Sequence, residues 1–234
     1  EADYANPDAA ERLPMIRELL KQGKNAEAQE VMYERFVPRK PTGGGTYGSY
    51  EVLGQLVVDF AYDTEADVEG YTRGLDLETA TAWTEFTRGG TRYSRQCYVS
   101  RPDDVMVMEI ETEGPAKLDF TASLDRAGRC TLEATEDGLL KMSGTLDSGA
   151  EGVEGMKYAA YAKVITDGGK ATMLEDSLAI AVKDADKAWI IISAATDYFE
   201  GDGYDAKAHE LLLAVDRPQK MHSKAVKAHR ELFD

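Results

Sequence analysis

Residues 79–100, TATAWTEFTRGGTRYSRQCYVS, decide the class of fold. Two runs rich in β-branched and aromatic residues, 79–87 and 91–100, flank the pair Gly89-Gly90. Such runs favour strands, and a glycine pair between them is typical of the tight turn of a β-hairpin. The stretch therefore predicts two antiparallel strands joined by a short turn.

The sequence on both sides of this hairpin repeats the strand pattern. Turn signals such as Ala127-Gly128, Asp137-Gly138 and Gly168-Gly169 separate the runs. Nine further strands are predicted, at residues 52–60, 104–112, 117–125, 129–135, 139–146, 156–166, 170–176, 177–184 and 188–198. About eleven strands with few helices between them favour an antiparallel β-sandwich over a parallel βαβ sheet. The predicted fold is mainly β, an antiparallel β-supersandwich.

Helical patterns stand before this β region and form an αα-hairpin. Asn6-Pro7 matches a helix N-cap followed by proline in the first turn. Pro14 is expected to break or kink the first helix, because proline lacks the N–H that a helix interior needs. Asn25 is expected to cap the second helix, whose apolar residues include Ala28 and Phe36.

Helical patterns also follow the β region, at residues 204–215 and 219–234. The final helix still carries Leu232-Phe233 at its last positions, and we expect it to continue in a longer natural chain. Three parts are thus predicted. Residues 1–48 form a helical hairpin and a glycine-rich connector, 49–200 form the β-sandwich domain, and 201–234 form a helical linker.

The connector contains TGGGTYG at residues 42–48, in which Gly43, Gly45 and Gly48 fit G-x-G-x-x-G. A dinucleotide-binding loop needs these glycines between a strand and a helix N-terminus. Here they follow a helix and precede a strand, so nucleotide binding is excluded. The glycines are interpreted as a flexible connector.

Composition excludes several classes of partner. Acidic residues number 43 and basic residues 27, which gives a formal net charge of −16. Such a charge argues against nucleic acid or an anionic membrane surface as partner. No apolar run approaches the roughly 20 residues needed to span a bilayer. No cofactor is predicted.

Cysteine and histidine give no metal site. Cys97 and Cys130 lack metal-ligand spacing, and they are expected either as buried thiols or as a single disulfide in an exported protein. His222 and His229 are seven residues apart on a predicted helix, about 10 Å along its axis, too far to share one ion. Together with His209, they are expected to be solvated.

Acidic and aromatic clusters are weighed as possible sites. Asp76 and Glu78 are expected to share a strand face, and Asp205 to cap a helix after the GDGYD turn. The other loop acids considered are Asp103, Asp104 and Asp202. Surface or turn-forming roles are favoured for all of them.

The aromatics considered near the hairpin are Trp83, Phe86, Tyr93 and Tyr98. Core or cross-strand packing is favoured for these, with Trp83 and Tyr93 as possible cross-strand neighbours and sugar stacking as the alternative.

An ordered set of motifs covers nearly the whole chain. The segments are residues 6–28, 50–60 (YEVLGQLVVDF), 71–80 (YTRGLDLETA), 95–105 (RQCYVSRPDDV) and 194–198 (AATDY). In this order they resemble the amino-terminal β-domain of glycoside hydrolase family 95, whose members are α-L-fucosidases and some α-L-galactosidases. The chain departs from the family pattern at Val52, Gln55, Ala225 and His229.

The resemblance implies a fragment of a longer enzyme. Family members carry their catalytic groups in an (α/α)6 barrel that follows the sandwich and the helical linker. Inverting hydrolysis needs a general acid and a general base about 6.5–9.5 Å apart, and in this family both lie in the barrel. No catalytic, cofactor-binding or metal residue is therefore assigned to this chain.

The expected partners are the catalytic barrel of the same natural chain and, through it, an oligosaccharide. Two functions are carried forward. In the first, the chain is the structural amino-terminal domain of an α-L-fucosidase-like hydrolase and is inactive by itself. In the second, it is a non-catalytic carbohydrate-binding sandwich, which exposed aromatics on one sheet face would support. For the full-length enzyme, export to a periplasm or the cell surface fits action on host or plant glycans.

Overall fold

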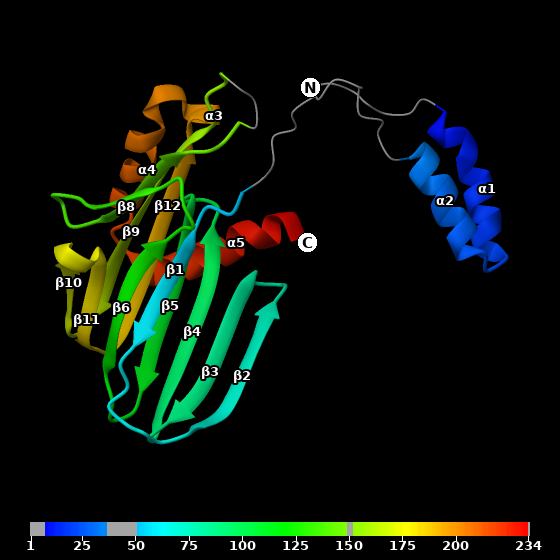
Figure 1. Cartoon of the computed structure of the whole chain (residues 1–234). Helices are drawn as coiled ribbons and strands as arrows, with labels where there is room; N and C mark the ends of the chain where they lie inside the picture. Colours follow the sequence, from blue (N-terminus) through cyan, green and yellow to red (C-terminus); the bar gives the residue numbers. More distant parts are fainter. Residues whose placement is uncertain (1–7, 37–50, 149–151, 234) are drawn as a thin grey trace. The chain divides into compact units, whose positions relative to one another are not determined.

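The computed structural model describes residues 8–36, 51–148 and 152–233 (Figure 1). The chain divides into two compact units, Glu1–Ser49 and Tyr50–Asp234. The predicted cap at Asn6-Pro7 and the glycine-rich connector at 42–48 lie outside the described residues.

The first unit contains two helices, α1 (Ala9–Lys21) and α2 (Asn25–Arg35). Of the predicted break or kink at Pro14 the break is wrong, because α1 runs through this residue. A proline in a helix removes one main-chain hydrogen bond. The predicted cap at Asn25 is also wrong by one residue, since Lys24 is the N-cap.

The second unit is built on twelve strands, one more than predicted. They are β1 (Gln55–Phe60), β2 (Val68–Asp76), β3 (Thr81–Arg88), β4 (Thr91–Ser100), β5 (Val105–Glu113), β6 (Leu118–Asp125), β7 (Thr131–Ala134), β8 (Leu140–Thr145), β9 (Lys157–Asp167), β10 (Lys170–Leu174), β11 (Ala179–Ala185) and β12 (Lys187–Thr196). The strand that sequence reasoning missed is β2. It contains Gly70 and Gly74 and lies at a sheet edge with nearly every side chain exposed, so it shows no apolar alternation.

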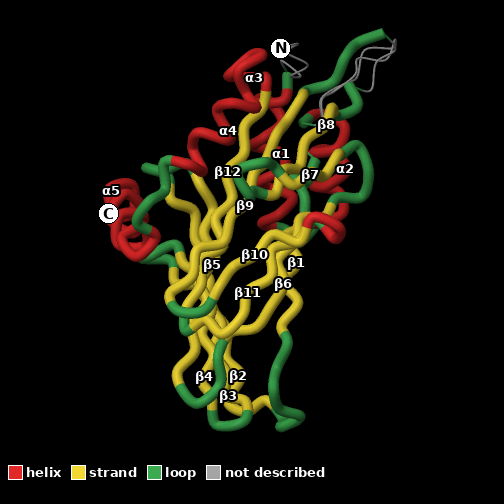
Figure 2. Tube along the Cα trace, turned by 90° about the vertical axis from the view of Figure 1, so that its left-hand side faces the viewer, coloured by secondary structure: helices red, strands yellow, loops and turns green. Residues whose placement is uncertain are grey.

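The strands form two antiparallel sheets, which confirms the predicted fold class. The smaller sheet has the order β1-β6-β11-β10. The larger sheet has the order β2-β3-β4-β5-β12-β9-β8-β7. Figure 2 shows the two sheets as layers, with α4 and α5 beside the larger one on the side away from the smaller one. We call the face of the larger sheet toward the smaller sheet its inner face.

The hairpin β3–β4 forms as predicted. Phe86 lies opposite Tyr93, and Gly89 and Gly90 turn the chain with φ of 57° and 77°. Positive φ at both central residues is the geometry of the two-residue turns that match the twist of antiparallel strands. The rings of Phe86 and Tyr93 stack with centroids 5.1 Å apart.

The core has two layers, one on each face of the larger sheet. Between the sheets, Ile110 and Ile190 pack with Phe120 and Val182 of the smaller sheet. On the other face, the buried residues are Tyr98, Val105, Val107, Leu139, Ala159, Tyr161, Trp189, Ile191, Ala208, Leu212, Val215, Met221 and Ala225. Because β12 is buried on both faces, it reads in the sequence as a continuous apolar run.

The chain after β12 is helical, and these helices pack on the outer face of the larger sheet. The elements are α3 (Asp197–Glu200), η2 (Gly201–Gly203), α4 (Tyr204–Leu213), η3 (Pro218–Lys220) and α5 (Met221–Phe233), and a further short turn, η1 (Glu175–Ser177), precedes β11. Ala208 and Leu212 of α4 are fully buried against β9 and β12. These helices therefore belong to the same compact unit as the sandwich.

Candidate functional site

A pocket of about 380 Å³ lies where the chain enters β1, beside the ends of β9 and β12. Its wall is mostly apolar and its rim carries charged side chains. The lining residues are Glu51, Leu53, Asp104, Arg126, Leu146, Met156, Tyr158, Ala194, Ala195, Thr196, Phe199 and Glu200. The AATDY motif at the end of β12 thus forms part of this wall.

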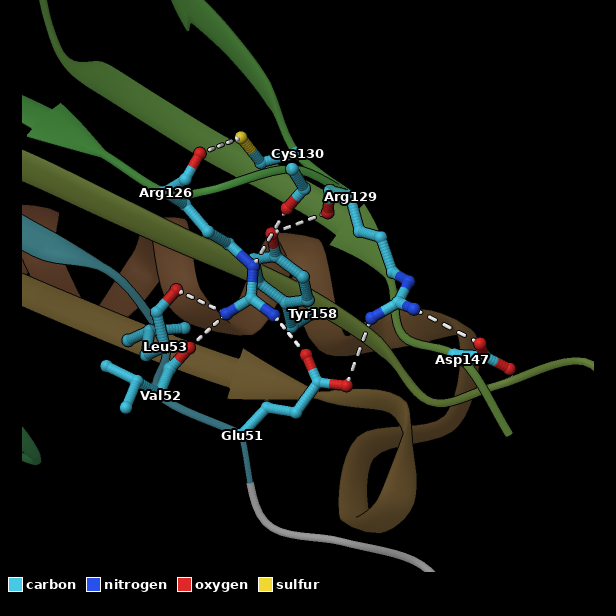
Figure 3. A network of polar contacts seen from close by, with 9 residues as sticks. Glu51, Val52, Leu53, Arg126, Arg129, Cys130, Asp147 and Tyr158 are labelled. Atoms are coloured by element: carbon cyan, nitrogen blue, oxygen red, sulfur yellow. Dashed lines mark hydrogen bonds and ion pairs between the residues drawn. The ribbon is translucent and has the colours of Figure 1, made fainter. Parts of the chain in front are cut away.

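Arg126 is the centre of the polar network at the pocket (Figure 3). Its guanidinium donates to Oε2 of Glu51 at 2.6 Å, to the carbonyl of Leu53 at 2.9 Å, and to the carbonyl of Val52. Its Nε donates to the carbonyl of Gly128 at 3.2 Å. The side chain is only 9% exposed. Four partners satisfy a buried cation, as burial requires, and they fix the residues before β1 onto the turn after β6.

A second arginine extends the network to the surface. Arg129 donates to Oε1 of Glu51 at 3.2 Å and to Asp147 at 3.1 Å, while its carbonyl accepts from the hydroxyl of Tyr158 at 2.9 Å. The ring of Tyr158 lies 5.2 Å from the guanidinium carbon of Arg126. Burial raises the pKa of Tyr158 above its usual range. Glu51 therefore lies between two arginines and accepts a hydrogen bond from each.

Two exposed aromatic rings stand beside the pocket on α3. Tyr198 is 75% exposed and Phe199 is 86% exposed, and their rings meet edge to face with centroids 4.8 Å apart. The start of α3 is fixed by Asp197, whose Oδ1 accepts the main-chain N–H of Lys157 at 3.0 Å. The carboxylates that line the pocket are those of Glu51, Asp104 and Glu200, and Glu51 accepts hydrogen bonds from Arg126 and Arg129.

A second polar cluster joins α4 to the larger sheet. Asp205 accepts from Nζ of Lys141 at 2.9 Å and from the hydroxyl of Tyr161 at 2.8 Å. The predicted N-cap role of Asp205 is wrong, because Gly203 is the N-cap and Asp205 lies inside α4. Burial by itself would raise the pKa of Asp205, but the bonds from Lys141 and Tyr161 outweigh it, and the pKa lies below the usual range.

This lowered pKa predicts an acid-sensitive contact between α4 and the sheet. The folded-state pKa lies below the unfolded value of about 3.9, so the stabilisation is complete above about pH 4. It is lost as pH falls through the folded-state pKa. We expect Asp205→Asn to lower the free energy of unfolding at pH 7 by about 1 kcal/mol, a modest loss because solvent screens the partly exposed pair.

The measurement is urea unfolding at a series of pH values from 7 down to 3. Asp205→Asn should show a shallower loss of stability on acidification than the unchanged chain. Asp202→Asn is the matched control, because Asp202 lies on the exposed turn just before α4. Parallel acid profiles for Asp205→Asn and the unchanged chain would contradict the assignment.

The other acidic residues singled out in the sequence do not form a pair. Asp76 ends β2 and accepts the main-chain N–H of Glu78 at 2.9 Å, so it is a turn former. The expectation that Glu78 shares a strand face with it is wrong, because Glu78 lies in the turn. Asp103 accepts from the hydroxyl of Ser100 at 2.5 Å in the turn between β4 and β5, next to Asp104.

The histidines are not free in solvent as expected. His222 Nε2 lies 2.9 Å from the hydroxyl of Thr81, and His229 Nε2 lies 2.9 Å from the carbonyl of Leu77. His209 Nε2 lies 2.7 Å from the carboxylate of Asp137. Each imidazole therefore joins a C-terminal helix to another part of the unit: His222 contacts β3, and His209 and His229 contact turns between strands. The sequence showed only which residues share a helix face, because helical spacing contains no information on the residues that pack against that face.

Neither cysteine forms a disulfide. Cys97 and Cys130 are both free and partly buried, and burial raises the pKa of Cys97.

Within the described ranges, no group of three or more histidine, cysteine or acidic side chains is arranged to hold a metal ion. The same ranges contain no helix with the length and apolar character needed to cross a membrane.

The aromatic residues of the hairpin are packed, as favoured from the sequence. Phe86, Tyr93 and Tyr98 are between 2% and 6% exposed. The possible pairing of Trp83 with Tyr93 is wrong, since Trp83 lies opposite Gln96. The two positions differ by an odd number of residues in register, which places their side chains on opposite faces.

Sequence reasoning missed the residues that build the pocket network. Arg126 and Arg129 flank the predicted Ala127-Gly128 turn. Two arginines on either side of a turn were the only local sign that a polar network could form there. Their partner Glu51 lies 75 positions before Arg126. No local pattern connects residues so far apart.

Comparison with known proteins relates the chain to the N-terminal part of glycosyl hydrolases. Residues 1–201 match a family model described as glycosyl hydrolase family 65, N-terminal domain. Alpha-L-fucosidase 2 of Arabidopsis thaliana is 25% identical over 216 residues, which cover 84% of this chain and 25% of that protein. Probable alpha-fucosidase A of Aspergillus niger is 28% identical over 204 residues, covering 87% of this chain and 24% of that protein.

The fold is shared with a solved structure of a larger enzyme. A structure from the human microbiome assigned as a kojibiose phosphorylase aligns with a TM-score of 0.50 at 10% identity. The alignment covers 75% of this chain and 27% of that one. The chain thus spans about a quarter of the length of the curated relatives named above. The expected resemblance to the N-terminal domain of alpha-fucosidase-type glycosyl hydrolases is confirmed.

Proposed function

The chain belongs to the glycosyl hydrolase family 65 N-terminal domain family, and from this we propose that it is the structural N-terminal domain of an α-L-fucosidase-like inverting hydrolase. The whole protein would release terminal α-L-fucosyl or α-L-galactosyl residues. Catalysis would lie in a barrel domain outside these 234 residues, which is also the domain's principal partner. The match of two fucosidase-named relatives over more than four fifths of the chain carries this proposal.

The packing of the C-terminal helices supports a structural role. Helix α5 is attached to the sheet by His222 and His229, and Arg101 donates to the carbonyl of Ala228 at 2.9 Å. On β9, Lys163 donates to the carbonyl of Val215 just after α4, at 2.8 Å. These contacts hold the helices rigidly on the sandwich. A domain that positions a following domain needs such a fixed exit.

A carbohydrate-binding module is the second candidate, and one observation favours it. Tyr198 and Phe199 are exposed side by side next to the pocket of about 380 Å³. Aromatic rings in contact with water are typical of surfaces that bind a partner with an apolar face. The row of exposed aromatics that we expected for this function on a sheet face is not seen among the described strands, where Tyr71 stands alone.

Fucose release by two proteins distinguishes the candidates. The 234-residue chain and the full-length gene product are each incubated with an α-1,2-fucosylated oligosaccharide and with its α-L-galactosyl analogue. We expect release by the full-length protein only. Release by the 234-residue chain would contradict the placement of catalysis outside it.

Binding is measured in parallel, because it separates the module from the structural domain. If neither protein releases sugar but the chain binds the oligosaccharide, the binding-module function is supported. In that case Phe199→Ala should abolish binding, whereas the control Phe233→Ala should not, because Phe233 is exposed at the far end of α5.

A further inference from the structure

Strand β1 is the open edge of the smaller sheet, pairing with β6 alone among the described strands. Ala61, just after β1, donates its N–H to the carbonyl of Asp119 at 2.9 Å. In an antiparallel pair only alternate residues bond to the partner strand. The main-chain groups of Leu56, Val58 and Phe60 therefore point away from β6. Such a row of free N–H and C=O groups is a template for another strand.

The core beneath β1 is incompletely covered. Leu56, Val58 and Phe60 pack against the core between the sheets, yet each stays partly exposed. The corresponding core residues of the neighbouring strand β6 are all buried, namely Leu118, Phe120, Ala122 and Leu124. Burial thus stops at the free edge of β1.

Beyond this edge the inner face of the larger sheet continues. In Figure 1, β2, β3 and the near part of β4 extend past β1 with no strand drawn in front of them. This uncovered face carries six apolar side chains, which we call the shelf, and the polar side chains of Arg73 and Thr84. The shelf residues are Leu75, Ala82, Cys97, Val99, Met106 and Met108. Leu75 is 62% exposed and Val99 is 67% exposed. A cavity of about 470 Å³ is lined by three of the shelf residues.

Arg95 marks the junction between β1 and the shelf. Its guanidinium carbon lies 3.9 Å from the centroid of the Phe60 ring, and Nη2 donates to the hydroxyl of Tyr62 at 2.8 Å. Its Nε is buried and has no hydrogen-bond partner among the described residues. The guanidinium thus holds the end of β1 against β4 at the border of the shelf.

We propose that the free edge of β1 and the shelf bind an extended strand supplied by another part of the same longer polypeptide. The strand bonds to the main chain of residues 56, 58 and 60. Its alternate apolar side chains cover the shelf. This inference rests on the proposed function, because it requires a chain longer than 234 residues.

One observation favours an extended segment over a helix, and two favour a tethered segment over a second copy of the chain. The free groups of β1 are main-chain groups in strand spacing, which an extended segment satisfies and a helix does not. The curated relatives are about four times as long as the region they share with this chain, so chain is available to supply the strand. Two copies each carrying a formal charge of −16 repel one another, whereas a tethered segment has a millimolar effective concentration.

Cys97 reports on the shelf without any engineered probe there. The rate of labelling of Cys97 by a maleimide is measured in a Cys130→Ser background, in the 234-residue chain and in the full-length protein. We expect labelling to be at least about tenfold slower in the full-length protein, because the covering strand must open first. Lys170→Cys in a background without the native cysteines is the control, since Lys170 is exposed on β10 at the opposite edge of the smaller sheet.

A charged substitution gives a second readout. Val99→Lys should leave the stability of the 234-residue chain nearly unchanged, because residue 99 is exposed there. It should lower that of the full-length protein, in which the position is covered. Equal Cys97 labelling in both proteins, or slow labelling already in the 234-residue chain, would overturn the proposal.

Two further results separate the competing explanations. Protection of Cys97 that rises with the concentration of the 234-residue chain, together with a dimer in sedimentation, would assign the edge to a second copy and overturn the proposal. Fucose release by a full-length protein whose Cys97 stays accessible would contradict the covering strand and leave the proposed function intact. Protection of Cys97 in a full-length protein that releases no fucose would support the covering strand and contradict the proposed function.

Discussion

Replacing Trp189 by alanine should lower the free energy of unfolding by about 3–5 kcal/mol, the cost of deleting a fully buried tryptophan. Trp189 is 1% exposed on β12 and packs in the core between the larger sheet and the C-terminal helices. Its indole N–H donates to Oε2 of Glu109 at 3.1 Å. The substitution removes this donor and opens a cavity in that core.

The expected consequence is a destabilised helical layer as well as a weaker sandwich. For a unit of this size, such a loss lowers the melting temperature by roughly 10 °C. Urea unfolding followed by far-ultraviolet circular dichroism measures it without relying on tryptophan fluorescence. Hydrogen exchange of the amides of the C-terminal helices should rise more than that of the β6 amides, because these helices share the core of Trp189 and β6 belongs to the core on the other face of the sheet.

Trp83→Ala is the matched control, since Trp83 is the other tryptophan of the chain. Its ring is partly exposed and lies over the backbone of Gly74, where a Cβ would approach within 2.8 Å of the ring. We expect less than half the loss seen for Trp189→Ala, because little cavity forms at a sheet edge. Equal losses for the two variants would mean that the helices do not contribute to the core as described.

Arg126→Met should lower the free energy of unfolding by about 3 kcal/mol, because it leaves the partners of a buried cation without their donor. The carboxylate of Glu51 keeps only Arg129, and the carbonyls of Val52 and Leu53 lose their donor. Methionine preserves much of the side-chain volume, so the loss reports on polar contacts rather than on a cavity.

Arg129→Met is the control for this prediction. The side chain of Arg129 is 48% exposed, and exposed ion pairs contribute about 1 kcal/mol or less. The double variant Arg126→Met with Glu51→Gln should be less destabilised than the sum of the single changes, because the two residues share one interaction. Strict additivity would show that the Arg126–Glu51 pair is not coupled in solution.

Local sequence determined the strands and their turns. The hairpin β3–β4 follows from two β-rich runs and the Gly89-Gly90 turn, since side-chain alternation and positive φ are properties of a few neighbouring residues. The same reasoning failed at β2, because this strand contains glycines and exposes nearly all its side chains, so its sequence does not alternate between apolar and polar residues. It failed at Pro14 because a helix of 13 residues tolerates one missing hydrogen bond. The ordered motifs also determined the family, because they preserve identity and order along the chain.

Only the tertiary structure decided which strands lie side by side and which side chains meet. The order β1-β6-β11-β10 joins strands far apart in sequence, and His222 meets Thr81 across 141 positions. The polar network around Arg126 and the uncovered shelf beside β1 depend on the same long-range pairing of strands. Hydrophobic alternation specifies that a strand has one buried face, but many pairings bury that face equally well. The choice among them is made by the packing of the whole core, which no local stretch of sequence contains.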